Sequence, residues 1–303
     1  MKKKIVIAGA TGLIGKRICS KLIERGDEVT ILTRSVDNAK TAIPRAAKYV
    51  YWNLFLSDWM KELEGAEAVI NLAGENLMAK RWTDAHKKNI RDSRIITTAK
   101  LIEAISCLKV KPKVFISASA VGFYGSTENE VDETSKMGEG FLAELVNDWE
   151  KETQKVDELN IRRINVRIGI VLDKNEGALA KMITPFKFFV GGPLGSGNQW
   201  MPWIHINDLT NIFLFSVDND NVKGIINGVT PNPVRMNEFA GTIGKVLNRP
   251  SIFKVPGFVL KIILGEAASV VLEGANVKPK KLQTLGYKFL YDDLEKALTA
   301  ILK

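Results

Sequence analysis

Residues 4–34, KIVIAGATGLIGKRICSKLIERGDEVTILTR, decide the fold. The stretch begins with a short, branched apolar run, Ile5–Ala8, of the kind found in a strand that is covered on both faces. Three glycines follow in a GxxGxxG spacing, and a segment of helix length comes next. A second apolar run, Val29–Leu32, ends the stretch. This order of strand, glycine turn, helix and strand is typical of a dinucleotide-binding unit.

A physical reason explains why each position of this spacing requires glycine. Gly9 allows the sharp turn, Gly12 lets a diphosphate approach the backbone, and Gly15 lets the helix pack closely on the strand. The helix predicted from about Gly12 to Arg25 directs its free N–H groups and its positive end toward that diphosphate. An ordinary glycine turn of an α/β protein is the alternative. The cofactor contacts predicted here are Gly9, Thr11, Gly12, Leu13, Ile14 and Gly15.

The residue that follows the second strand predicts which dinucleotide binds. NAD-specific folds usually place Asp or Glu there, where the carboxylate holds the ribose hydroxyls. This chain has Thr33-Arg34-Ser35 instead. An arginine can pair with a 2′-phosphate through two parallel hydrogen bonds. The sequence therefore predicts NADP(H) rather than NAD(H), with a solvated arginine at a strand end as the alternative.

Composition narrows the class of protein. The 303 residues carry a net charge of +9, which suits an anionic cofactor or substrate. We expect no nucleic-acid partner, because the chain has no arginine-rich tract or zinc-finger spacing. Cys19 and Cys107 lack metal-ligand neighbours, so we expect no metal and a reduced compartment. No run approaches the ~18–20 apolar residues that span a bilayer. With no signal peptide evident in the lysine-rich start, the sequence predicts a cytoplasmic protein without membrane association.

Strand-like and helix-like segments alternate through the first half of the chain. Further strands are predicted at 48–52, 67–72, 113–117 and 162–168, and helices at 58–64, 84–106 and 139–159. This rhythm predicts an α/β fold with a doubly wound, parallel Rossmann sheet. Residues 173–204 interrupt the rhythm. We therefore predict an NADP-binding domain at 1–172, to which 205–228 return. The remaining 173–204 and 229–303 form a smaller, mostly helical region on the substrate side. Within it, helices are predicted at 237–247, 258–272 and 292–302, and a homodimer is possible through the apolar part of the second.

Small and polar residues follow the later strands. Ligands of doubly wound sheets bind at the carboxyl ends of the strands, where small residues let a cofactor lie against the backbone. Hydroxyls there can meet its ribose and amide groups, although a serine in a turn can also satisfy only the backbone. The contacts predicted at these ends are Asn71, Leu72, Ala73, Gly74, Glu75, Ser117 and Gly169.

These motifs resemble those of the extended short-chain dehydrogenase/reductases. The similar stretches are GATGLIG, NLAG after the fourth strand, SASAVGFYG after the fifth and RIGIVL after the sixth. More narrowly, NLAGENLMAKRW, IRDSR and GSGNQWMPWIHINDL resemble the atypical "epimerase family" proteins of that superfamily. The resemblance covers nearly the whole chain. It implies an NADP-dependent oxidoreductase or epimerase that acts on a small molecule, such as a sugar nucleotide.

The catalytic motif departs from that superfamily. Its active members use Tyr-x-x-x-Lys on the helix after the fifth strand, where the lysine lowers the pKa of the tyrosine. Here the tyrosine position falls on Phe141 or Leu142, and the lysine position falls on Leu145 or Val146. The resemblance places Ser119 at the position of the active-site serine. The missing pair leaves a non-catalytic NADP(H)-binding redox sensor or regulator as the alternative.

Aromatic residues supply the remaining candidates. Tyr124 lies in the GFYG that faces the substrate in relatives, and it is the second predicted catalytic residue; a packed aromatic is the alternative. Trp200, Trp203 and His205 would suit a flat ring or a sugar. A lone histidine, however, is more often a structural hydrogen-bonding residue.

Overall fold

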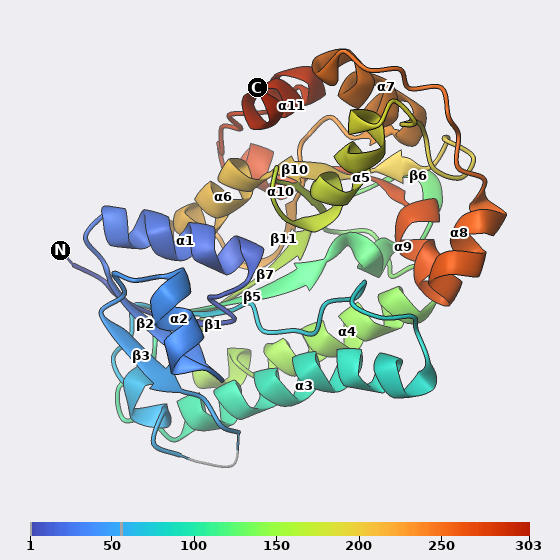
Figure 1. Cartoon of the computed structure of the whole chain (residues 1–303). Helices are drawn as coiled ribbons and strands as arrows, with labels where there is room; N and C mark the ends of the chain where they lie inside the picture. Colours follow the sequence, from blue (N-terminus) through green and yellow to red (C-terminus); the bar gives the residue numbers. More distant parts are fainter. Residues whose placement is uncertain (1, 55–56) are drawn as a thin grey trace.

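A seven-stranded parallel sheet forms the centre of the molecule, in the order β11-β7-β5-β4-β1-β2-β3 (Figure 1). The computed structural model describes residues 2–54 and 57–303. The strands are β1 (Lys4–Ala8), β2 (Glu28–Thr33), β3 (Lys48–Tyr51), β4 (Ala68–Asn71), β5 (Val114–Ala120), β7 (Arg162–Ile168) and β11 (Gly224–Gly228). β1 pairs with β2 on one side and β4 on the other. Successive strands are therefore added first on one side of β1 and then on the other. Doubly wound sheets bind ligands at such a reversal of strand order.

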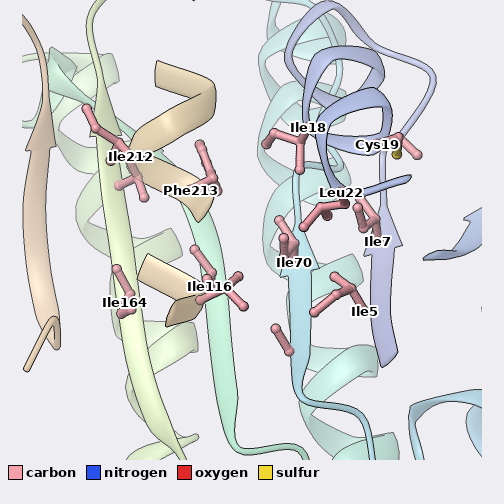
Figure 2. Packing of buried hydrophobic residues seen from close by; sticks show 14 of the residues in the cluster. Ile5, Ile7, Ile18, Cys19, Leu22, Ile70, Ile116, Ile164, Ile212 and Phe213 are labelled. Carbon is pink, nitrogen blue, oxygen red and sulfur yellow. The ribbon is translucent and has the colours of Figure 1, made fainter. Parts of the chain in front are cut away.

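Side chains along β1 alternate between two apolar cores. Ile5 and Ile7 pack in one core, and Val6 and Ala8 pack in the other. This period of two, apolar on both sides, explains why the strand has no polar face. Figure 2 shows Ile18 and Leu22 of the first core beside Ile5, Ile7 and Ile70. The helices on the two faces are α1 (Leu13–Glu24) and α6 (Ile206–Asp218) on one, and α3 (Asp84–Ser106) and α4 (Phe141–Gln154) on the other (Figure 1).

A second group of elements stands beyond the carboxyl edge of the sheet and has its own apolar core, which includes Phe239, Ile243 and Leu298. Three two-stranded sheets, β10–β8, β12–β9 and β13–β6, lie outside the central sheet. Their strands are β6 (Thr127–Val131), β8 (Ile170–Leu172), β9 (Trp200–Met201), β10 (Trp203–His205), β12 (Val234–Arg235) and β13 (Ala275–Val277). The helices are α5 (Gly177–Lys187), α7 (Met236–Leu247), α8 (Gly257–Leu264), α9 (Ser269–Leu272) and α11 (Leu294–Leu302). α10 (Lys280–Thr284) packs instead against β11 of the central sheet, where Leu282 joins the core that contains Ile5 and Ile7.

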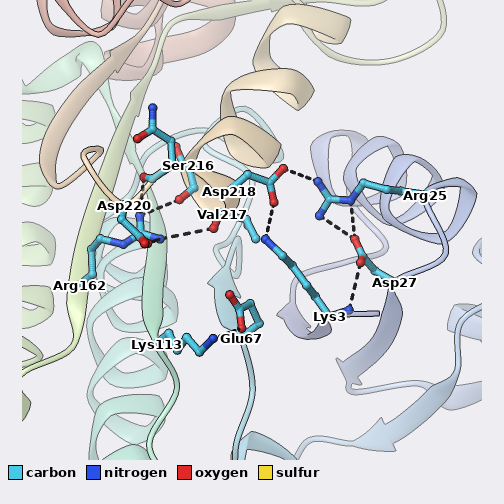
Figure 3. A network of polar contacts seen from close by, with 11 residues as sticks. Lys3, Arg25, Asp27, Glu67, Lys113, Arg162, Ser216, Val217, Asp218 and Asp220 are labelled. Atoms are coloured by element: carbon cyan, nitrogen blue, oxygen red, sulfur yellow. Dashed lines mark hydrogen bonds and ion pairs between the residues drawn. The ribbon is translucent and has the colours of Figure 1, made fainter. Parts of the chain in front are cut away.

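Polar contacts fasten the returning segment, α6 and β11, to the first part of the chain (Figure 3). Arg162 donates to the carbonyl oxygens of Ser216, at 2.8 Å, and Val222, at 3.0 Å. The first of these bonds satisfies a carbonyl that the end of α6 leaves unpaired, and the second holds the loop that follows the helix. The Lys3 ammonium lies 2.7 Å from the Asp218 carboxylate. Residues near the chain start and residues near 218 are thus held together.

The sequence predicted the α/β class and the parallel sheet, and both are confirmed. The predicted helix 258–272 is wrong as one element, because Gly265 has a φ of 63° and separates α8 from α9. The predicted helix 139–159 ends at Gln154 and begins only after Gly140, which has a φ of 94°. α2 (Val36–Ala42) was not predicted. Within residues 2–54 and 57–303, no helix is long and apolar enough to cross a membrane.

Candidate active site

The three glycines after β1 meet different surroundings. Gly9 has a φ of +79°, and an added Cβ would lie 2.6 Å from the carbonyl carbon of Leu72. A Cβ on Gly15 would lie 2.5 Å from the carbonyl oxygen of Ala10. Both positions therefore exclude a side chain because the backbone itself passes there. A Cβ on Gly12 would meet only the Gly9 oxygen, at 3.6 Å. The second glycine thus faces open space, where a ligand could approach.

A cavity of about 1330 Å³ begins at Leu13 and Ile14, directly after this turn, and runs along the carboxyl edge of the sheet. Ligand pockets commonly measure about 300–1,000 Å³, so this cavity has room for a dinucleotide and a second molecule. Ser119 lines it between the turn and the far end. Of the predicted cofactor contacts, those that line it are Leu13, Ile14, Leu72, Ala73, Gly74 and Gly169.

Two predicted contacts support the site from behind. The Asn71 side chain is fully buried, donates to Thr98 Oγ1 at 2.9 Å and accepts from the Ala73 N–H at 3.2 Å. It fixes the loop that lines the cavity. Ser117 is also fully buried, and its hydroxyl donates to the Ala118 carbonyl at 3.0 Å. The geometry of Ser117 matches backbone satisfaction, the alternative considered for it. The Glu75 backbone bonds to Ser93 and Arg94.

Arg34 lies in solvent directly after β2. Its guanidinium makes no hydrogen bond or ion pair with the residues that the structure describes, whereas Arg17 and Arg25 are each paired with an aspartate. Thr11, at the glycine turn, is also exposed. An unpaired guanidinium after this strand can bind a phosphate without first breaking another contact.

A buried polar cluster lies behind Ser119. The Ser119 hydroxyl donates to Glu150 Oε1 at 2.5 Å. Arg167 grips the same carboxylate with two hydrogen bonds, of 2.8 Å from Nε and 2.7 Å from the terminal nitrogen. The side chains of Glu150 and Arg167 are only 7% and 4% exposed. Because the Ser119 proton is directed at Glu150, its lone pairs remain for a donor in the cavity.

Tyr124 belongs to the same cluster and does not line the cavity. Its hydroxyl donates to Asn227 Oδ1 at 2.8 Å and accepts from Arg167 at 3.0 Å. Burial raises the pKa of Tyr124 to about 12. The phenol that the sequence placed toward a substrate is therefore held inside the protein, as the packed-aromatic alternative has it.

Sequence reasoning did not single out Glu150 or Arg167. One signal was available, since Arg167 interrupts an apolar run that continues a buried strand. Charged side chains are rarely buried in such strands unless they are paired. The partner, 17 positions earlier on α4, could not be identified from spacing.

The predicted aromatic group lies elsewhere. Trp203 is fully buried in the core that contains Phe239, Ile243 and Leu298. Neither Trp200 nor Trp203 lines the cavity. His205 is 3% exposed, stacks on Tyr291 and accepts the Asn207 N–H at 3.0 Å. It caps α6. The aromatic side chains that line the cavity are Trp82, Phe141, Trp149 and Phe258.

The region expected to hold the Tyr-x-x-x-Lys pair also faces the cavity. Phe141, Leu142, Leu145 and Val146 all line it, so the first turns of α4 present apolar groups there. No cluster of three or more His, Cys, Asp or Glu side chains able to hold a metal occurs in 2–54 or 57–303.

Comparisons with known proteins show which family the chain resembles. Residues 5–227 fit the model of the NAD-dependent epimerase/dehydratase family, and residues 255–301 fit a domain of unknown function, DUF1731. The "Epimerase family protein SDR39U1 homolog, chloroplastic" of Arabidopsis thaliana is 42% identical over 99% of this chain and 86% of its own length. "Epimerase family protein YfhF" of Bacillus subtilis is 37% identical, over 98% of this chain and 97% of its own length.

A solved structure agrees over the same length. The crystal structure of human epimerase family protein SDR39U1, determined with NADPH, superposes with a TM-score of 0.88. The two chains are 32% identical, and the match covers 98% of each.

Proposed function

The chain belongs to the NAD-dependent epimerase/dehydratase family and, within it, to the atypical short-chain dehydrogenase/reductases named epimerase family proteins; we propose that it is an NADP(H)-dependent oxidoreductase or epimerase. One observation carries the proposal. A single cavity runs from Leu13 and Ile14, which directly follow the glycine turn, to Ser119, and Gly12 beside them has room for a ligand. NADPH in the human relative supports the choice of cofactor.

The residues present fit an extended dinucleotide. The diphosphate would lie over Gly12, at the positive end of α1. Leu72–Gly74 and Gly169 would flank the ribose and the nicotinamide, and Arg34 would hold the 2′-phosphate. In this proposal 1–172 and 205–228 bind the cofactor, and 173–204 and 229–303 contribute to the substrate side. Nicotinamide, when bound, supplies hydride chemistry: it takes a hydride from an alcohol carbon or gives one to a ketone.

The chain's own residues handle the proton. Ser119 accepts a hydrogen bond from the substrate hydroxyl, because its own proton is directed at Glu150. As the alcohol becomes a ketone, the hydroxyl proton moves to the Ser119 oxygen and the Ser119 proton moves to Glu150 Oε1. Arg167 acts as a positioning residue, since it fixes both oxygens of that carboxylate. Tyr124 supports Arg167 from behind rather than meeting the substrate.

The cofactor assignment is tested by titrating NADPH and NADH into the wild-type protein and the Arg34→Ala variant. We expect NADPH to bind more tightly to the wild type, and the preference to fall roughly tenfold or more in the variant, because a charge-assisted pair is lost. Lys109→Ala is the matched control, since it removes an exposed cation beyond α3, away from the carboxyl edge. An unchanged preference in Arg34→Ala would remove Arg34 from the site.

A non-catalytic NADP(H)-binding sensor is the second candidate function. The apolar side chains at the usual Tyr and Lys positions favour it, as does the buried phenol of Tyr124. Incubation with NADPH and a panel of carbonyl compounds, followed by NADPH absorbance, separates the two. Loss of absorbance with any member supports the oxidoreductase, and tight NADPH binding with every substrate recovered unchanged supports the sensor.

A further inference from the structure

The cavity changes character beyond Ser119. There its wall is an apolar cluster in which Trp82 and Leu145 are buried, and the partly buried Phe141 and Leu142 pack against them. The Trp82 and Phe141 rings meet edge to face, with centroids 5.1 Å apart. The members of this apolar cluster that also line the cavity are Leu77, Met78, Trp82, Phe141, Leu142, Leu145 and Val270.

Several polar atoms of this half are already engaged. The Trp82 indole N–H donates to the Leu77 carbonyl at 2.8 Å, and that of Trp149 donates to Thr98 Oγ1 at 3.0 Å. The Asn76 side-chain oxygen accepts from the Met78 N–H at 2.9 Å. A sugar ring would bring several hydroxyls here, and each buried hydroxyl left without a partner costs about 1–3 kcal/mol. The wall therefore disfavours a sugar.

Charge points the same way. Arg94 lines the cavity, but its guanidinium is buried against Trp149 and donates to the carbonyls of Ile90, at 2.9 Å, and Glu75, at 3.0 Å. The other charged side chains among the described lining residues lie exposed at the mouth: Glu139, Glu266, Glu273 and Lys261. Three of these four are acidic. Glu266 is already paired with Lys87, so a nucleoside diphosphate would meet the carboxylates of Glu139 and Glu273 beside Lys261 rather than a cluster of cations.

We propose that the half of the cavity beyond Ser119 binds a predominantly apolar, ring-bearing alcohol or ketone and excludes sugar nucleotides. This inference rests on the proposed function, because Ser119 supplies the one hydroxyl contact that such a ligand needs. The aromatic walls give flat rings a large contact area. The ligand's oxygen lies at Ser119, and its hydrocarbon part lies against Leu142, Leu145 and Trp82.

The test is a calorimetric titration of the full chain, saturated with NADPH, with two probes: the aromatic ketone acetonaphthone and UDP-glucose. We expect acetonaphthone to bind with a negative heat-capacity change, the sign of apolar burial, and UDP-glucose to bind at least about tenfold more weakly. Leu142→Asn should weaken acetonaphthone binding roughly tenfold or more, and Leu142→Met should retain it. NADPH affinity should be unchanged in both variants.

Three results would overturn the inference: UDP-glucose binding as tightly as the ketone, no ketone binding, or equal ketone binding by Leu142→Asn and wild type. The comparison of the two probes on wild type decides the matter even if Leu142→Asn does not fold. Failure of NADPH to bind would instead contradict the proposed function. The same two titrations on the cofactor-free chain then still test the apolar half by itself.

Discussion

Arg167→Met tests the buried cluster that holds Ser119. The substitution removes a guanidinium that is 4% exposed and keeps much of the side-chain volume. It leaves the Glu150 carboxylate buried with Ser119 as its remaining donor among the contacts of this cluster. It also removes the cation from above the Phe123 ring, whose centroid lies 3.4 Å from the guanidinium carbon.

The expected loss follows from these contacts. Breaking a buried ion pair by removing one partner costs about 3–5 kcal/mol, because the other charge stays buried and uncompensated. A desolvated cation–π contact is worth about 2 kcal/mol. We therefore expect the free energy of unfolding to fall by about 4 kcal/mol, and the melting temperature to fall by about 10 °C. Removing both charges should cost less than removing Arg167 alone, since no unpaired charge remains.

Urea unfolding of four proteins measures this: wild type, Arg167→Met, Glu150→Leu and the double variant. The predicted coupling energy between the two positions is about 2 kcal/mol or more. A loss below about 1 kcal/mol in Arg167→Met, or strict additivity of the two single changes, would refute the reasoning. Lys181→Met, on the exposed side of α5, serves as the control for a lysine-to-apolar change at the surface.

Two further predictions concern residues that contact the backbone of neighbouring residues, His205 and Gly15. Burial lowers the pKa of His205 to about 4, so its contribution to stability is present above about pH 6.5, the unfolded value, and is lost as the pH falls toward 4. His205→Asn keeps an N-cap acceptor without titrating, and urea unfolding at several pH values should show this dependence, up to about 3 kcal/mol, disappear. Gly15→Ala should lower the free energy of unfolding by about 2–3 kcal/mol, because its Cβ would meet the Ala10 backbone; stability equal to wild type would contradict that clash.

Much of the fold could be predicted because the signals are local. The apolar run of β1 and the glycine spacing lie within a dozen residues, and the alternation that follows is regular. The predicted helix boundaries were wrong where a glycine with a positive φ changes the direction of the chain. Gly265 splits the predicted helix 258–272, and Gly140 delays the start of α4. A positive φ at a glycine depends on the packing around it, which sequence periodicity does not report.

The candidate site also has a part with local sequence signals and a part without them. The turn around Gly12 and the small residues at 72–74 were predictable, since they follow strands of one sheet edge. The link from Ser119 to Glu150 and Arg167 joins β5, α4 and β7. It depends on how helix and strands are rotated against one another. The sequence predicted that Tyr124 faces a substrate because its motif follows β5. The motif predicts a turn there but does not determine the direction of the tyrosine ring, which points into the protein.

The central claim, that a dinucleotide lies over the glycine turn, is tested most directly by measuring NADPH affinity and unfolding midpoint for Gly12→Val. Gly12 has an extended backbone with a φ of −75°, and an added Cβ meets no closer atom than the Gly9 oxygen at 3.6 Å. We predict wild-type stability together with a loss of NADPH affinity of about a hundredfold. Gly241→Val, at another glycine whose Cβ would meet open space, should leave that affinity unchanged. A stable Gly12→Val protein that binds NADPH as the wild type does would contradict the claim.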